Sequence, residues 1–412
     1  MRFSQLLCVL WWALIGLPDA MGQSLGPTVL VGTVTNGRTQ APVAYASVSI
    51  LHTTIGTVSN DEGVFRLQVA GHVADTVVVQ ALGYAARKQP LSVALLATPL
   101  VFSLQPQATE LPDVRVTGLS PTALLSQAVR RTRADMASPL LLKTYYREFV
   151  TRDGRFTKFA DAMIDYYLEA NPRRPANPLV QAQVLQSRVG EAPAQGKGVG
   201  TALLPKPLDV TMAGNYYDIM HSSPFLDSTA FHFYVYRFQV LGADKESNEA
   251  TEYVVTCTPR TRAERHLRQA TIHIAPRTFH IRRIESEVPL ALQPYNYSVT
   301  MGMMSASITT YYKRLEYREV NGRVYPAFVR MEWEWRVVPL SKQPTYYNFS
   351  SEMVVTELAA VPAPIPSAHR YKGPLYRRGT KYSHPYWLEN NALPATKAEE
   401  KAIQELSTSV PR

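Results

Sequence analysis

The clearest alternation of apolar and polar residues runs from Val329 to Val337. Apolar side chains occupy every second position, at Val329, Met331, Trp333, Trp335 and Val337, and arginine or glutamate lies between them. Because the side chains of a β-strand point alternately to its two faces, this pattern predicts a strand with one buried face and one wet face.

Two dipeptides predict tight hairpins in the same half of the chain. Asp153-Gly154 and Asn321-Gly322 each separate two apolar-rich runs, and both pairs favour the positive φ values of primed turns. We therefore expect an antiparallel meander. Further strands are expected at Phe231–Leu241, Tyr253–Thr258, Ala270–Ala275, Thr278–Glu287, Ser305–Thr310 and Phe349–Leu358.

The N-terminal part of the chain shows a different pattern of strand and turn residues. From Val31 to Gly118, short β-branched runs are separated by Gly, Pro, Asn and Asp, which is typical of an all-β sandwich. Asn60 to Gly63 has the composition of a turn that tolerates positive φ, and Phe65 is expected to enter the sandwich core directly after it.

Helical signals are few. Ser120 is a suitable N-cap, Pro121 suits the first turn, and apolar residues recur at helical spacing as far as Met136. Thr396 and Glu399 have the spacing of a capping box for a short helix that ends near Leu406.

These patterns divide the chain into five parts. They are a signal peptide at 1–22, a β-sandwich at 28–118, a linker helix at 119–138, an antiparallel β domain at 139–362 with a mobile Pro- and Gly-rich insertion at 171–208, and a basic and aromatic tail with a short helix at 363–412. The predicted fold class is therefore mainly β.

The first residues predict export. An arginine precedes an apolar run from Leu6 to Leu17, and small residues around Gly22 suit a signal peptidase. Because Cys8 lies inside the apolar run rather than after the cleavage point, no lipid anchor is expected. We expect the protein in the periplasm, associated with the outer membrane, or at the cell surface. Cys257 would then be the sole cysteine of the mature chain, so no intramolecular disulfide is expected.

The sandwich segment resembles a known family. Ala46-Ser47-Val48, Gly56-Thr57-Val58, the Asn60 turn with Phe65, Leu82-Gly83-Tyr84 and the closing Val114 to Gly118 follow, in order, the pattern of the carboxypeptidase-like regulatory domain. That domain is a transthyretin-like sandwich of exported bacterial envelope proteins. The resemblance implies an adaptor domain without peptidase activity.

The second half resembles envelope proteins that carry this same sandwich. The segments that bear the resemblance are Tyr145–Phe149, Tyr253–Pro259, Ile272–Ile281 and the closing Tyr386-Trp387 with Asn390. Their second domain is similar to the half-barrel of periplasmic lipoprotein carriers, in which antiparallel strands wrap a helix or an apolar ligand. By that resemblance, Met331, Trp333 and Trp335 would serve either as core or as the wall of a ligand groove.

Candidate chemistry is sparse. The sequence has no His-x-x-Glu, His-Glu-x-x-His or Gly-x-Ser-x-Gly motif, so no catalytic residue, cofactor or carboxypeptidase zinc site is expected. A two-residue turn at Pro276 and Arg277 would place His273 opposite His280. These imidazoles could share a metal ion, but spacing suggests no third ligand, and no metal is expected.

Charge adds one element to the functional reading. The formal net charge of +10 is most simply explained by general solubility, and it also suits an anionic surface such as lipid, lipopolysaccharide or acidic glycan. Nucleic acid is not an expected partner of an exported protein. No segment has the apolar length of a membrane-spanning helix. The favoured function is a non-catalytic envelope protein that binds another envelope protein, a glycan or a lipid. The alternatives are a periplasmic carrier of lipid or another hydrophobic ligand, and an enzyme with a dispersed site.

Overall fold

The computed structural model describes most of the chain. The described residues are 29–69, 71–72, 75–92, 95–96, 98–107, 120–136, 138–171, 178–193, 209–218, 223–243, 250–260, 267–295, 297–301, 304–339 and 343–408. The expected signal peptide at 1–22 and the expected end of the sandwich at 108–118 lie outside them. The described part is mainly β, as predicted.

The N-terminal part is a β-sandwich, and the prediction is confirmed. Its two sheets have the strand orders β4-β1-β7 and β3-β2-β5-β6. The strands are β1 (Val29–Asn36), β2 (Ser47–Ile50), β3 (Gly56–Val58), β4 (Val64–Gln68), β5 (Thr76–Gln80), β6 (Arg87–Pro90) and β7 (Leu100–Leu104). Phe65 is fully buried in the core between the sheets, and Gly63 has the positive φ of +75° that its turn requires.

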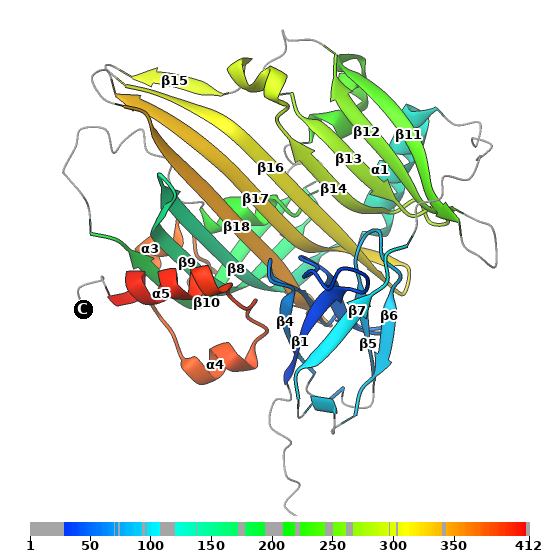
Figure 1. Ribbon diagram of the computed structural model, residues 1–412, viewed down its shortest axis with the longest axis horizontal. Helices are drawn as coiled ribbons and strands as arrows, with labels where there is room; N and C mark the ends of the chain where they lie inside the picture. The colour runs from blue at the N-terminus through cyan, green and yellow to red at the C-terminus, as the bar shows by residue number, and fades with distance from the viewer. Residues whose placement is uncertain are drawn as a thin grey trace, which may run out of the picture.

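Eleven strands of the described chain form one antiparallel sheet in the order β10-β9-β8-β18-β17-β16-β14-β13-β12-β11, with β15 beside β16 (Figure 1). Their bounds are β8 (Leu140–Arg152), β9 (Arg155–Glu169), β10 (Leu179–Glu191), β11 (Tyr234–Ala243), β12 (Ala250–Pro259), β13 (Gln269–Ile274), β14 (Ile281–Glu287), β15 (Ser298–Met301), β16 (Met304–Val320), β17 (Arg323–Pro339) and β18 (Thr345–Leu358). Both predicted hairpins are confirmed, because the Asp153-Gly154 and Asn321-Gly322 pairs all have positive φ.

Helix α1 (Pro121–Asp135) covers one face of this sheet. The side chain of Ser120 caps it as predicted, accepting a hydrogen bond from the backbone N–H of Ala123 at 3.2 Å. Leu124, Leu125 and Ala128 are buried in the same cluster as Val329 of β17. The expected linker helix is therefore part of the core of the second domain. Three short helices, α2 (Val210–Asn215), η3 (Pro224–Leu226) and η4 (Ser228–Phe233), contribute buried residues to this cluster or pack beside it.

The predicted mobile insertion at 171–208 is wrong for its central part. Residues 179–191 form β10, which pairs with β9 along its length and is an edge strand of the sheet. A register shift between Val184 and Gln186 changes which residues face inward. The sequence therefore lacks a regular alternation of apolar and polar residues, and its glutamines did not indicate a strand. The flanking residues 172–177 and 194–208 lie outside the described residues.

The C-terminal segment is packed onto the molecule. It contains η6 (Ser367–His369), α3 (Leu375–Arg378), α4 (His384–Glu389) and α5 (Lys397–Thr408), and η5 (Leu290–Tyr295) lies earlier in the chain. The capping box is confirmed: the N–H of Thr396 donates to Glu399 Oε2 at 2.7 Å, and the N–H of Glu399 donates to Thr396 Oγ1 at 3.3 Å. Helix α5 lies against β9 and β10 (Figure 1). Across the described residues, none of the helices has the length and apolar character to span a membrane.

Candidate functional site

A line of charged side chains crosses the sheet on the face that meets the sandwich. Directly paired residues of neighbouring antiparallel strands point to the same face. The strand registers link seven such residues from β10 to β14, and we call them the charged row. In spatial order they are Arg188, Asp161, Arg147, Glu352, Arg330, Arg314 and Glu285.

The centre of the charged row is buried and paired. Arg147 Nη2 lies 2.6 Å from Glu352 Oε2, and their side chains are 3% and 9% exposed. Glu352 Oε1 also accepts from Arg330 Nη1 at 3.1 Å. Burial disfavours the charged form of Arg147, but Glu352, Tyr145 and Glu399 together outweigh it and raise the pKa of the guanidinium. Ion pairing therefore offsets the desolvation of these charges.

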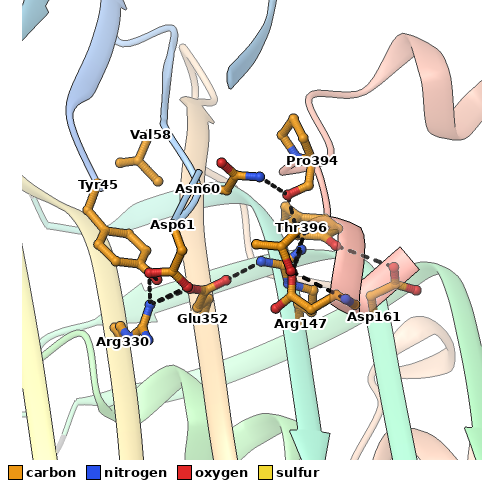
Figure 2. Close-up of polar contacts among 12 residues, drawn as sticks. Tyr45, Val58, Asn60, Asp61, Arg147, Asp161, Arg330, Glu352, Pro394 and Thr396 are labelled. Carbon is orange, nitrogen blue, oxygen red and sulfur yellow. Dashed lines mark hydrogen bonds and ion pairs between the residues drawn. The ribbon is translucent and has the colours of Figure 1, made fainter. Parts of the chain in front are cut away.

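One pair in the charged row has like charges, and the sandwich covers it. Arg330 is directly opposite Arg314. The ring of Tyr45 lies 4.5 Å from the guanidinium carbon of Arg330 and 5.5 Å from that of Arg314. The Tyr45 hydroxyl donates to Asp61 Oδ1 at 2.6 Å, and Arg330 Nη1 lies 3.3 Å from the same oxygen (Figure 2). The sandwich thus supplies both an aromatic face and a carboxylate to two facing cations.

This contact changes the expectation for β17. Arg330 belongs to the face of Val329–Val337 that was predicted to be wet, yet its side chain is only 18% exposed. Its neighbour Phe328 is fully buried and stacks on Tyr45 at a centroid distance of 5.4 Å. Both faces of β17 are covered here, because a second domain packs on the charged side.

The C-terminal segment closes the other side of the junction. The carbonyl oxygen of Pro394 accepts hydrogen bonds from Arg147 Nη1 at 3.2 Å and from Asn60 Nδ2 at 3.3 Å (Figure 2). Glu399 Oε2 lies 3.4 Å from Arg147 Nη1. One loop carbonyl therefore joins the sandwich to the sheet.

Asp61 is a titratable group of this junction. Partial burial, together with the nearby carboxylates of Glu352 and Glu332, raises the pKa of Asp61 to about 6. A cavity of about 240 Å³ adjoins it, with walls that include Arg147 and Glu399. The sandwich contact therefore contains a carboxyl group that changes charge in mildly acidic solution.

A larger cleft of about 500 Å³ lies between the two domains, and we call it the interdomain cleft. The sandwich contributes Ser47, Val58 and the loop 80–84, and the sheet contributes residues of β12, β14, β16 and β17. The wall is mixed, with apolar residues beside charged ones. The volume of the cleft lies within the range of small-molecule sites, although its wall carries more charged groups than such sites usually do.

The carboxylates of the interdomain cleft all have cationic or imidazole partners. Glu316 Oε1 lies 2.8 Å from Arg283 Nη2, Glu319 Oε2 lies 2.8 Å from His280 Nδ1, and Glu252 lies 3.3 Å from His273. Burial alone would raise the pKa of Glu316, but Arg283 and Arg314 outweigh it and lower the pKa. Glu316 is therefore neutralised by arginine, while Glu319 and Glu252 each lie beside an imidazole.

The two histidines do not form the predicted pair. His273 is opposite Arg283, because the turn is longer than two residues and the N–H of Ala275 donates to the carbonyl oxygen of His280 at 2.8 Å. His280 instead lies 2.8 Å from both Asp135 and Glu319. Among the described residues, no group of three His, Cys, Asp or Glu side chains could hold a metal ion.

The residues expected either in the core or in a ligand groove share one face of β17. Met331 is 2% exposed and lies in the cluster that contains α1. Trp333 stacks on Phe349 at 5.6 Å and 7°, and Trp335 meets Tyr297 at 5.6 Å. Each of them contacts protein. A ligand groove at these positions stays a prediction.

The charged row and the interdomain cleft were not found from the sequence. The available signal was a charged residue between apolar neighbours inside a strand, as in Ala160-Asp161-Ala162. Such a residue marks a buried charge, but only the register of seven strands shows that these charges are neighbours.

Comparisons with known proteins identify the N-terminal part. Residues 30–116 match the family model described as CarboxypepD_reg-like domain, so the predicted regulatory-like domain is confirmed for this segment. Among curated proteins, none matches the sequence. The chain is similar to the crystal structure of a LolA superfamily protein from Nitrosomonas europaea, with 9% identity over 61% of this chain and 97% of that one, at a TM-score of 0.20.

Proposed function

We propose that this protein is an exported, non-catalytic binding protein of the bacterial cell envelope, and that the interdomain cleft is its ligand site. The carrying observation is the cleft of about 500 Å³ whose walls come from both domains. The N-terminal domain supports the envelope location, because regulatory-like domains of this kind are typical of exported proteins. In this proposal the sandwich completes a site on the sheet.

The state of the reactive groups supports a binding role. The buried charges at the centre of the charged row form ion pairs with one another. Cys257 is buried on β12, and burial raises the pKa of its thiol, which disfavours the nucleophilic thiolate. These groups stabilise the structure, so we assign them no catalytic role.

The packing of the sheet favours the interdomain cleft over a carrier groove. A carrier needs an accessible apolar surface on its sheet. Here the apolar face that contains Met331 is covered by Leu124 and Leu125 of α1 as core. A lipid carried by this protein would have to displace α1.

The proposal is tested by native mass spectrometry of the protein purified from a bacterial envelope fraction. Ala86 and Ala85 are exposed neighbours, but only Ala86 lines the interdomain cleft. We expect a bound small molecule in the wild type, its loss from Ala86→Trp, and its retention in Ala85→Trp. A protein without bound mass, or equal binding by both variants, contradicts the proposal. Co-purified lipid that survives in Ala86→Trp would support the carrier.

A further inference from the structure

We infer that the interdomain cleft selects a ligand carrying an oxyanion, a carboxylate or a phosphate, and that Arg318 is the residue that recognises it. The inference rests on the proposed function and gives it a ligand class. Arg318 is on β16, in the wall of the cleft, and is 92% buried, its exposed fraction being 8%.

The carrying observation is the state of the Arg318 guanidinium. Its Nε, Nη1 and Nη2 atoms are buried, and among the described residues none of the three has a hydrogen-bond partner. Its ring contact is with Tyr325, at 6.0 Å. A buried guanidinium that donates no hydrogen bond is costly. Because its three nitrogens have almost no exposed surface, the Arg318 side chain must turn toward the cleft for an anion to accept from it, and the new hydrogen bonds then offset part of that cost.

The carboxylates that line the cleft lie beside groups other than Arg318. Glu316 pairs with Arg283, Glu319 lies 2.8 Å from His280, and Glu252 lies 3.3 Å from His273. An anion in the cleft would accept from a guanidinium that has no hydrogen-bond partner among the described residues. The flat fork of a guanidinium matches the two oxygens of a carboxylate or phosphate.

The sandwich packs against this guanidinium. Gly56 on β3 packs against it so closely that a Cβ at position 56 would lie 2.1 Å from Nη1 of Arg318. Gly56 has no positive φ, so alanine is acceptable to the backbone there. Gly56→Ala is consequently a variant that moves the guanidinium without removing its charge.

The test is calorimetric titration of the full chain at pH 7 and low salt with three probes: inorganic phosphate, glucuronate and glucose. We expect at least one anionic probe to bind and glucose not to bind. Binding should weaken about tenfold or more in Arg318→Met, as expected for loss of a charged hydrogen bond. It should weaken severalfold in Gly56→Ala, and stay unchanged in Arg87→Met, an exposed arginine outside the cleft. Which anion binds tells phosphate from carboxylate chemistry.

Three results overturn the inference. They are equal binding of glucose and glucuronate, absence of binding by both anions, and wild-type affinity in Arg318→Met. Thermal unfolding of each variant shows whether it is folded, and Gly56→Ala remains informative if Arg318→Met unfolds. If Ala86→Trp releases the native ligand while Arg318→Met retains it, the cleft is the site and only the ligand class is wrong.

Discussion

The ring of Tyr45 covers the one pair of the charged row in which two arginines face each other. Like charges directly opposite on neighbouring strands destabilise a sheet. The tyrosine ring and the carboxylate of Asp61 offset this repulsion between Arg330 and Arg314. Tyr45 also has a φ of +56°, which is uncommon for a residue with a bulky side chain, so the surrounding contacts must hold it there.

Replacing Tyr45 should separate its two roles. In Tyr45→Phe the hydrogen bond to Asp61 is lost while the stacking on Phe328 remains, so we expect about 1 kcal/mol less stability. In Tyr45→Ala the buried ring is also lost, and we expect about 3 kcal/mol. Denaturant unfolding gives both values. Equal losses in the two variants would show that the ring does not contribute.

Lys313 offers a second test at this scale. It is 2% exposed on β16, and burial, together with nearby Arg268, lowers its pKa to about 7 although Asp218 opposes this. Between pH 7 and the pKa of a free lysine, near 10.4, Lys313 is protonated in the unfolded chain and deprotonated in the folded protein. The free energy of unfolding should therefore rise with pH across this window.

Lys313→Met should abolish this pH dependence. Below pH 7 the variant should be more stable than the wild type by about 4 kcal/mol, the equivalent of roughly three pKa units. Urea unfolding at pH 6, 8 and 10 measures the difference, and Lys143→Met, at a half-exposed site, serves as control. A wild-type stability that is flat from pH 7 to 10 would contradict the assignment.

At the scale of elements, the sequence correctly predicted the turns and helix caps that depend on neighbouring residues. The Asp153-Gly154 and Asn321-Gly322 turns, the Ser120 cap and the Thr396 capping box are all present, because each depends on residues next to one another. The prediction failed where a distant partner decides. β10 is a strand because β9 pairs with it, and His273 lies opposite Arg283 because the turn is longer than its dipeptide suggested.

The cap of α5 has a consequence beyond its own helix. Glu399 takes part in the capping box and also lies beside Arg147, while Leu406 packs against Phe149 and Phe159. Fraying of α5 would therefore uncover part of the charged row.

Thr396→Ala should loosen this helix. Loss of an N-cap side chain costs about 1 kcal/mol, so amide exchange within α5 should become about fivefold faster wherever it proceeds by local opening. Hydrogen-exchange mass spectrometry of residues 397–408 measures this, with Ser407→Ala as a control inside the same helix. Equal acceleration in both variants would assign the effect to the helix body rather than its cap.

At the scale of the whole molecule, the sandwich and the sheet are joined by charged contacts as well as by an apolar cluster. The N-terminal family was recognisable from the sequence because its turns and strand residues are local. The junction was not, because it brings together Asp61, Arg330 and Pro394 from three distant parts of the chain. Burial of paired charges between domains makes docking sensitive to solution conditions that leave an apolar interface unchanged.

The pKa of Asp61 determines how this group changes the stability of the protein with pH. Its pKa of about 6 lies above the usual value near 3.9, so the folded protein binds the additional proton between these two values. Stability from this group is therefore present below about pH 4 and lost as pH rises to about 6. The charges around the carboxyl oppose one another, with Arg330 and Arg147 on one side and Glu352, Glu332 and Glu62 on the other. Water reaches 51% of the side chain, so we expect an effect of about 1 kcal/mol or less.

Asp61→Asn removes the titration while keeping an acceptor for the Tyr45 hydroxyl. The stability difference between this variant and the wild type, measured by denaturant unfolding, should therefore change between pH 4.5 and pH 7, in favour of the variant at the higher pH. The comparison cancels the other acidic groups, because both proteins contain them. A difference that is constant with pH would mean that Asp61 is ionised throughout, and that Arg330 controls it more strongly than burial and the neighbouring glutamates do.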